Sequence, residues 1–155
     1  MSFQIHALPY APFAPLFALS DAELAARRAR RVTADVSPGF PCRVSLADAA
    51  PGETLLLLHY EHQPADSPYR ASHAIFVREN AKQAFPEAGT VPEVLASRLL
   101  SVRAFDANHD MVAADVVDGK TLGAAIDSMF RDGAIAYLHL HNARPGCFAA
   151  SVTRG

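Results

Sequence analysis

The chain has few cysteines and no long apolar run, and both absences exclude classes of protein. Its 155 residues contain two cysteines, Cys42 and Cys147, which are too few for a disulfide scaffold. One Cys42–Cys147 bridge, thiol or metal chemistry, and two inert buried thiols are the alternatives, and a reducing compartment argues against the bridge. No stretch of about 18 apolar residues occurs, so we expect no transmembrane helix and no membrane partner.

The familiar catalytic and cofactor motifs are also missing. The sequence has no Gly-rich phosphate loop, no G-x-S-x-G elbow, no C-x-x-C pair and no H-E-x-x-H helix. The sequence therefore indicates no particular cofactor and leaves open whether the protein is an enzyme. Residues 1–6 lack the basic and apolar regions of a secretory signal, so we expect a cytoplasmic protein.

Neither sign of charge dominates the composition. The 14 basic and 16 acidic residues give a net charge of −2, which provides no basis for steering the domain onto nucleic acid. Hydrophobic residues make up 50% of the chain and charged residues 19%, as is typical of a folded protein. Its length predicts a single domain over residues 1–155.

Local patterns predict several helices. Ser20-Asp-Ala-Glu23 has the spacing of a capping box and predicts a helix to about Arg31, with four arginines near its end. Pro92 is suited to the first turn of a short helix. Thr121 is suited to cap a helix that carries Leu122, Ala125, Ile126 and Met129 on one side.

Strand patterns are more numerous than helix patterns. Residues 53–62 are apolar on both faces and predict a central strand that is covered on both sides. Further strands are predicted at residues 4–8, 43–46, 73–77, 98–106, 111–117, 135–142 and 147–153. Because most links between strands are short, we predict an α+β fold with a mostly antiparallel, strongly curved or partly closed sheet and two or three helices.

Two histidines near the end of the chain form the main candidate site. On a strand, His139 and His141 point to the same face, while Leu138 and Leu140 form the opposite, core-facing side. Such a pair is suited to general acid or base catalysis. A transition-metal site is an alternative, but no third ligand has diagnostic spacing, and we assign no metal ligands. The remaining alternative is two hydrogen-bonded histidines on a half-exposed sheet face.

Cys147 is a third candidate catalytic residue, and the register of the last two strands decides its position. With residues 143–146 as a four-residue loop, Asn142 pairs with Cys147, and the thiol lies on the leucine face. With a three-residue loop, the thiol shares the face of the two histidines. Pro145-Gly146 is suited to a type II turn, which does not distinguish the two registers.

Several further side chains are candidate ligand-binding residues. Tyr60 and Arg70 flank a proline-containing loop between two strands, where polar groups are commonly presented. Arg70 is suited to hold a carboxylate or phosphate, or else to tie down its own loop. Arg103 lies in the middle of a predicted strand, and Arg144 follows the histidine pair, where it would favour an anion.

Several motifs together resemble a known family. Ser67-Pro-Tyr-Arg-Ala-Ser72, Ala74-Ile-Phe-Val-Arg78, Cys42-Arg-Val-Ser-Leu46, His141-Asn-Ala and Gly146-Cys-Phe are similar to motifs of domain of unknown function 1203. The resemblance spans nearly the whole chain and implies a bacterial, single-domain protein. It implies no activity and no functional residues.

We therefore expect a small anionic molecule to bind in a pocket lined by His139, His141, Arg70 and Tyr60, where one histidine acts as general acid or base if a reaction occurs. Arg103 and Arg144 are further candidates for ligand binding, and Cys147 is a further candidate for catalysis. One alternative is a non-catalytic interaction or structural module that forms a homodimer through sheet edges or the proline-rich N-terminal segment. The other alternative is a transition-metal site on His139 and His141.

Overall fold

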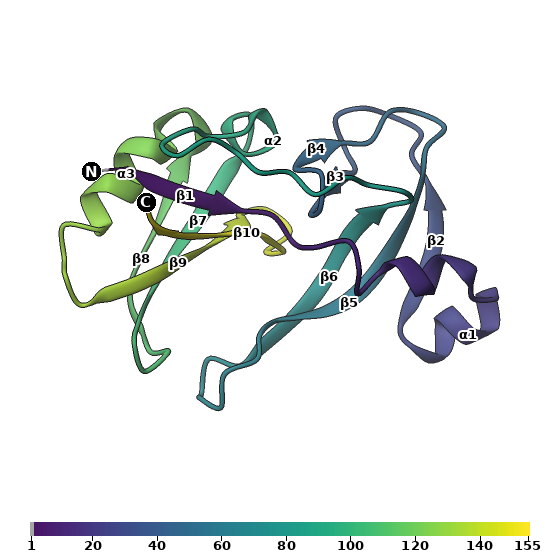
Figure 1. Cartoon of the computed structure of the whole chain (residues 1–155), viewed down its shortest axis with the longest axis horizontal. Helices are drawn as coiled ribbons and strands as arrows, with labels where there is room; N and C mark the ends of the chain where they lie inside the picture. Colours follow the sequence, from purple (N-terminus) through teal and green to yellow (C-terminus); the bar gives the residue numbers. More distant parts are fainter. Residues whose placement is uncertain (1) are drawn as a thin grey trace.

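Two five-stranded sheets lie side by side in the computed structural model, which describes residues 2–155 (Figure 1). We call the first the β9 sheet. All of its strand pairs are antiparallel. Its strands, in spatial order, are β1 (Phe3–His6), β10 (Phe148–Arg154), β9 (Ile135–Asn142), β7 (Leu99–Asp106) and β8 (Met111–Asp118).

The second sheet, which we call the β5 sheet, is mixed. Its strands, in spatial order, are β2 (Ala29–Thr33), β5 (Thr54–Gln63), β6 (Ala71–Arg78), β3 (Pro41–Cys42) and β4 (Ala47–Asp48). The pair formed by β3 and β6 is parallel, and the others are antiparallel. The predicted strand-rich architecture with few helices is confirmed. The predicted partly closed sheet is wrong, because the strands divide into two open sheets. The strand pairing is mostly antiparallel, as predicted, apart from the parallel pair of β3 and β6.

Short helices connect and cover the sheets. They are the 3-10 helix η1 (Ala14–Ala18), α1 (Asp21–Ala26), α2 (Glu93–Ala96), the 3-10 helix η2 (Gly119–Thr121) and α3 (Leu122–Met129). The predicted capping box is present, since the side chains of Ser20 and Glu23 each accept a hydrogen bond from the other's backbone N–H at 3.2 Å.

The helix that follows this box is shorter than predicted. It ends at Ala26, and Arg28 adopts a left-handed φ of 56°. The chain then continues as β2, which pairs with β5 from Ala29↔Leu58 to Thr33↔Thr54. Of the four arginines expected near the helix end, Arg30 and Arg31 therefore lie in an edge strand, because pairing with the apolar β5 overrides local helix propensity. Among residues 2–155, no helix has the length and apolar character needed to cross a membrane.

Each sheet has its own hydrophobic core. Leu122 and Ile126 of α3 pack with the β9 sheet, whose Leu138 and Leu140 are fully buried, as the strand pattern predicted. In a second cluster, apolar residues of the β5 sheet pack against the N-terminal segment and α1. Phe148 is the first residue of β10 in the β9 sheet, but its side chain packs in the core of the β5 sheet. This side chain therefore helps to join the two sheets.

A close backbone contact fixes the segment that leads into β7. Gly119 donates its N–H to the carbonyl oxygen of Arg98 at 2.8 Å. A Cβ atom at position 119 would lie 2.7 Å from the carbonyl oxygens of Ala96 and Arg98, and closer still to that of Leu95. Only glycine fits between these carbonyl groups without displacing α2.

We expect Gly119→Ala to lower the free energy of unfolding by about 3 kcal/mol, because the added methyl group overpacks rigid backbone atoms. Urea denaturation measures this change. The control is Gly133→Ala, since a Cβ at Gly133 meets no atom within 4 Å. The control should change stability by less than about 0.5 kcal/mol. Equal stability of the two variants would contradict the close-approach argument.

Candidate functional site

The hairpin between β9 and β10 determines which sheet face carries Cys147. Asn142 donates its N–H to the Cys147 carbonyl oxygen at 2.8 Å, and Gly146 donates to Asn142 at the same distance. Residues 143–146 thus form the four-residue connection, and His141 pairs with Phe148. Because cross-strand partners share a face, Cys147 lies with Asn142 on the face opposite His141. The alternative register, which would unite the thiol with the histidines, is not formed.

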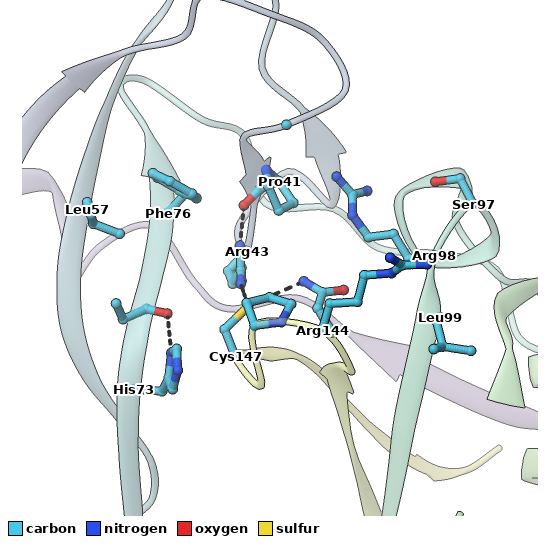
Figure 2. A pocket seen from close by; sticks show the side chains of 14 residues that line it. Pro41, Arg43, Leu57, His73, Phe76, Ser97, Arg98, Leu99, Arg144 and Cys147 are labelled. Atoms are coloured by element: carbon cyan, nitrogen blue, oxygen red, sulfur yellow. Dashed lines mark hydrogen bonds between the residues drawn. The ribbon is translucent and has the colours of Figure 1, made fainter. Parts of the chain in front are cut away.

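The sulfur of Cys147 contacts a buried guanidinium group (Figure 2). Arg43, only 2% exposed, donates from Nη2 to Cys147 Sγ at 2.9 Å. The same side chain donates to the carbonyl oxygens of Phe148 at 2.7 Å and Pro41 at 2.5 Å. Asn142 Nδ2 lies 3.5 Å from the same sulfur. Each of the three guanidinium nitrogens therefore donates a hydrogen bond within the protein.

The charge of Arg43 has no carboxylate partner. The ion pairs among residues 2–155 involve other arginines, and none involves Arg43. Burial lowers the pKa of the Arg43 guanidinium from its usual value, and the neighbouring Cys147 sulfur opposes that shift. An arginine nevertheless stays protonated in a protein, and an isolated buried charge is very costly. Among residues 2–155, Cys147 is the one side chain hydrogen-bonded to Arg43 that can become anionic.

A cavity of about 570 Å³ opens beside this pair, and we call it the cysteine pocket. Figure 2 shows Leu57, Phe76 and His73 along one wall and Arg98 and Leu99 along the other. The labelled Arg43 and Cys147 lie between these walls. The complete lining is Gly39, Pro41, Arg43, Leu57, His73, Ala74, Phe76, Ser97, Arg98, Leu99, Asn142, Arg144, Pro145 and Cys147.

The arginines of the cysteine pocket differ in their partners. Arg98 forms a two-pronged ion pair with Asp48, with distances of 2.7 and 3.1 Å, so its charge is already balanced. Arg144 is exposed, and within residues 2–155 its side chain forms no hydrogen bond or ion pair. The pocket therefore contains one guanidinium group that is free to bind an anion from solution.

The predicted histidines belong to a separate cluster on the other face of β9. His62 of β5 lies against both of them, with ring centroids 4.8 Å from His141 and 6.2 Å from His139. Phe148 covers the group at 5.3 Å from His139 and 5.9 Å from His141. The three imidazoles are at most 9% exposed. The half-exposed face considered from the sequence is therefore wrong, because the β5 sheet covers it.

Burial keeps the histidine cluster uncharged at neutral pH. Desolvation is the main cause that lowers the pKa of His62 to about 4, of His139 to about 4 and of His141 to about 3. Repulsion from Arg103 contributes to all three shifts. Arg103 pairs with His139 across β7 and β9, and its Nε donates to Ser101 Oγ at 3.2 Å.

A second cavity of about 440 Å³, the histidine hollow, adjoins this cluster. The Nδ1 atoms of His62 and His139 are buried and have no hydrogen-bond partner among residues 2–155. His, Cys, Asp and Glu side chains in those residues form no group of three with the geometry to hold a metal ion. The hollow is lined by His62, Gln63, Pro64, Ala65, His109, Tyr137, His139, Ser151 and Thr153.

Two other predicted ligand-binding residues lie in structural contacts. Tyr60 packs between the rings of Phe13 and Phe148, with centroid distances of 6.0 and 6.2 Å. Arg70 binds Glu61 through Nε at 3.0 Å and Nη2 at 3.3 Å, across the hairpin of β5 and β6. Neither residue lines the cysteine pocket. The predicted set is thus divided: Cys147 and Arg144 share one pocket, whereas His139, His141 and Arg103 lie together elsewhere.

Sequence reasoning missed Arg43, Asn142 and His62 as members of these sites. Arg43 lies 104 residues from Cys147, in a tight turn that the sequence had suggested to be a strand. No local motif indicates such a contact. His62 had a usable signal, because strand alternation from the buried Leu58 places it on the inward face of β5.

The cluster should make stability depend on pH. Because the folded pKa values lie below the ordinary value of 6.5, the unfolded chain binds more protons between about pH 6.5 and pH 4. The stabilisation is complete above pH 6.5 and is lost as the pH falls, by up to about 1.4 kcal/mol per pH unit for each histidine. Urea denaturation from pH 7.5 to 4.5 measures this slope.

Two variants separate the cluster from other acid-sensitive groups. His139→Gln should flatten the slope by about a third, since one of three shifted groups is removed. His59→Gln is the control, because His59 is exposed on the same strand as His62. The control should retain the wild-type slope. A wild-type protein that is equally stable at pH 6.5 and pH 4.5 would show that the imidazoles are not held neutral.

Comparison with known proteins places the chain in one family. The family described as "Protein of unknown function (DUF1203)" matches residues 39–154, which include every strand from β3 to β10. The match also includes Arg43, Cys147 and the three clustered histidines. Neither the curated proteins nor the solved structures contain a match to this chain. Since the matched segment covers well over half of the sequence, the chain belongs to the family of domain of unknown function 1203.

Proposed function

We propose that this protein binds a small anionic molecule, bearing a carboxylate or phosphate group, in the cysteine pocket. The observation that carries the proposal is that the unpaired Arg144 guanidinium lines the same cavity as the Arg43–Cys147 pair. A guanidinium group binds either anion through two parallel N–H donors. The cavity size is within the range common for small-molecule sites.

The charges around the pocket support an anion rather than a cation. Asp48 already balances Arg98, and among residues 2–155 the one side chain that is hydrogen-bonded to Arg43 is Cys147. No carboxylate side chain is among the residues that line the pocket. An incoming anion therefore meets net positive charge inside a partly enclosed cavity, where electrostatic attraction is stronger than in bulk water.

We expect the Arg144→Ala variant to bind small anions about tenfold more weakly than the wild type, because a charge-assisted hydrogen bond to an anion is lost. Calorimetric titration with malonate and with inorganic phosphate at low ionic strength measures this difference. Malonamide, which has nearly the shape of malonate without its charge, should bind to neither protein.

Arg70→Ala is the matched control, since Arg70 is an exposed arginine outside the pocket and pairs with Glu61. This control should retain wild-type affinity. Failure of both anions to bind the wild type, or equal weakening by the two substitutions, would overturn the proposal.

The histidine hollow favours a second candidate function, in which His139 acts as a general base with His141 and Arg103 positioned beside it. Its support is the unpartnered Nδ1 of His139 at the edge of a cavity. A neutral imidazole is the form that accepts a proton. Ring ¹⁵N NMR at pH 7 should show one unprotonated nitrogen in His139, and a doubly protonated ring would exclude this role.

We also propose that the chain forms a single domain, because Arg43 and Phe148 connect the two sheets through buried contacts. The homodimer considered from the sequence stays a prediction. The edge strand β8 gives it some support, since Val112 and Val116 are 48% and 57% exposed there.

A further inference from the structure

We propose that Cys147 is a nucleophile, held as a thiolate by Arg43, which attacks an electrophilic carbon of the anionic molecule in the cysteine pocket. This inference rests on the proposed function, since it uses the same pocket and the same class of ligand. It adds a reaction to what is otherwise a binding site. The substrate class is a small molecule that carries a carboxylate or phosphate close to a carbon with a leaving group.

The charge of Arg43 is the first support. Arg43 is 2% exposed, and within residues 2–155 the hydrogen-bond partners of its guanidinium are two carbonyl oxygens and Cys147 Sγ. Carbonyl oxygens satisfy hydrogen bonds but carry no net charge. A thiolate on Cys147 provides the counter-ion that the buried cation otherwise lacks, and the cation in turn favours the thiolate.

Asn142 provides an independent second observation. It is 5% exposed and lines the cysteine pocket, and its Nδ2 is directed to the sulfur of Cys147. Its Oδ1 is buried with no hydrogen-bond partner among residues 2–155. Leaving a buried acceptor unpaired costs about 1–3 kcal/mol. A ligand with a hydroxyl or amide donor would satisfy this atom while its anionic group binds Arg144.

The other cysteine has a different environment and serves as an internal reference. Cys42 is 1% exposed, and its sulfur accepts backbone N–H groups of Ser45 at 3.4 Å and Arg78 at 3.3 Å. Within residues 2–155 no guanidinium donor bonds to it, and it is not among the residues that line the cysteine pocket. Cys42 is thus a core thiol, whereas Cys147 is a pocket thiol beside a cation.

The proposed step needs no oxidant and no metal. A sulfur lone pair of Cys147 forms a bond to the electrophilic carbon, and the bond from that carbon to the leaving group breaks. The leaving group departs with the bonding electrons as an anion, and the sulfur becomes a neutral thioether. Arg43 remains protonated throughout, and the anionic group of the attached molecule then replaces the thiolate as the nearby negative charge.

Alkylation by iodoacetate and iodoacetamide tests the step, because these reagents differ mainly in charge. Both form a thioether and release iodide. Peptide mass spectrometry after short exposure at pH 7 gives separate rates for Cys147 and Cys42. The same measurement on the urea-unfolded chain gives the ordinary reactivity of each thiol, of which only a few per cent is thiolate at this pH.

We expect iodoacetamide to label Cys147 about tenfold faster in the folded than in the unfolded protein, and Cys42 far more slowly when folded. Arg43→Met, which keeps the aliphatic volume but removes the charge, should abolish the acceleration. If Arg43→Met does not fold, the labelling rates of Cys147 in the folded and the unfolded wild type decide whether Cys147 is a nucleophile. Folded Cys147 that reacts no faster than the unfolded thiol would overturn the nucleophile proposal.

The ratio of the two reagents tests anion selectivity separately. Relative to the unfolded chain, folded Cys147 should favour iodoacetate over iodoacetamide about tenfold, and Arg144→Ala should remove this preference while Arg70→Ala retains it. Rapid labelling by iodoacetamide without an iodoacetate preference would support the nucleophile and contradict the anion site. Anion binding in calorimetry without accelerated labelling of Cys147 would support the anion site and contradict the nucleophile.

Discussion

The contact between Arg43 and Cys147 is the interaction on which the rest of the site depends. Backbone hydrogen bonds hold Arg43 in the β5 sheet region, since its N–H donates to Phe76 and its carbonyl accepts from Leu8. Its side chain crosses to the β9 sheet and binds Phe148 and Cys147 there. One buried cation therefore fixes how the final hairpin lies against the other sheet. A buried charge at this position is costly unless its surroundings compensate it, and the sulfur of Cys147 is one of its hydrogen-bond partners, which links the packing of the two sheets to this thiol.

The register of the final hairpin places the thiol of Cys147 and the imidazoles of His139 and His141 in two separate sites. A shift of one residue would place Cys147 beside His139 and His141 and away from Arg43. The observed register instead places the thiol against a permanent cation and the imidazoles against aromatic rings. These environments have opposite effects. A cation favours the ionised thiol, whereas apolar surroundings favour uncharged imidazole. The two faces of one strand pair thus carry a thiol beside a cation and a set of neutral imidazoles.

Local sequence patterns predicted what local physics determines. The strand in the apolar run at residues 53–62, the strands at residues 98–106 and 111–117, and the capping box at Ser20 were all identified correctly, since each depends on nearby residues. The end of α1 was missed, because Arg28 reverses the chain and β2 gains its stability from β5. The division into two sheets was missed for the same reason. Which strands pair is decided by contacts between residues far apart in the sequence.

The same limit explains which site residues were identified. His139, His141 and Cys147 stand out because histidine and cysteine carry recognisable chemistry within one short segment. Arg43 looks like an ordinary polar residue beside Cys42, and only the folded chain brings it to a sulfur 104 residues away. Its burial also explains why Arg144 is the arginine left for a ligand. Arg43 is occupied by the sulfur and two carbonyl groups, and Arg98 by Asp48. Among the arginines that line the pocket, Arg144 is therefore the one whose guanidinium has no partner within residues 2–155.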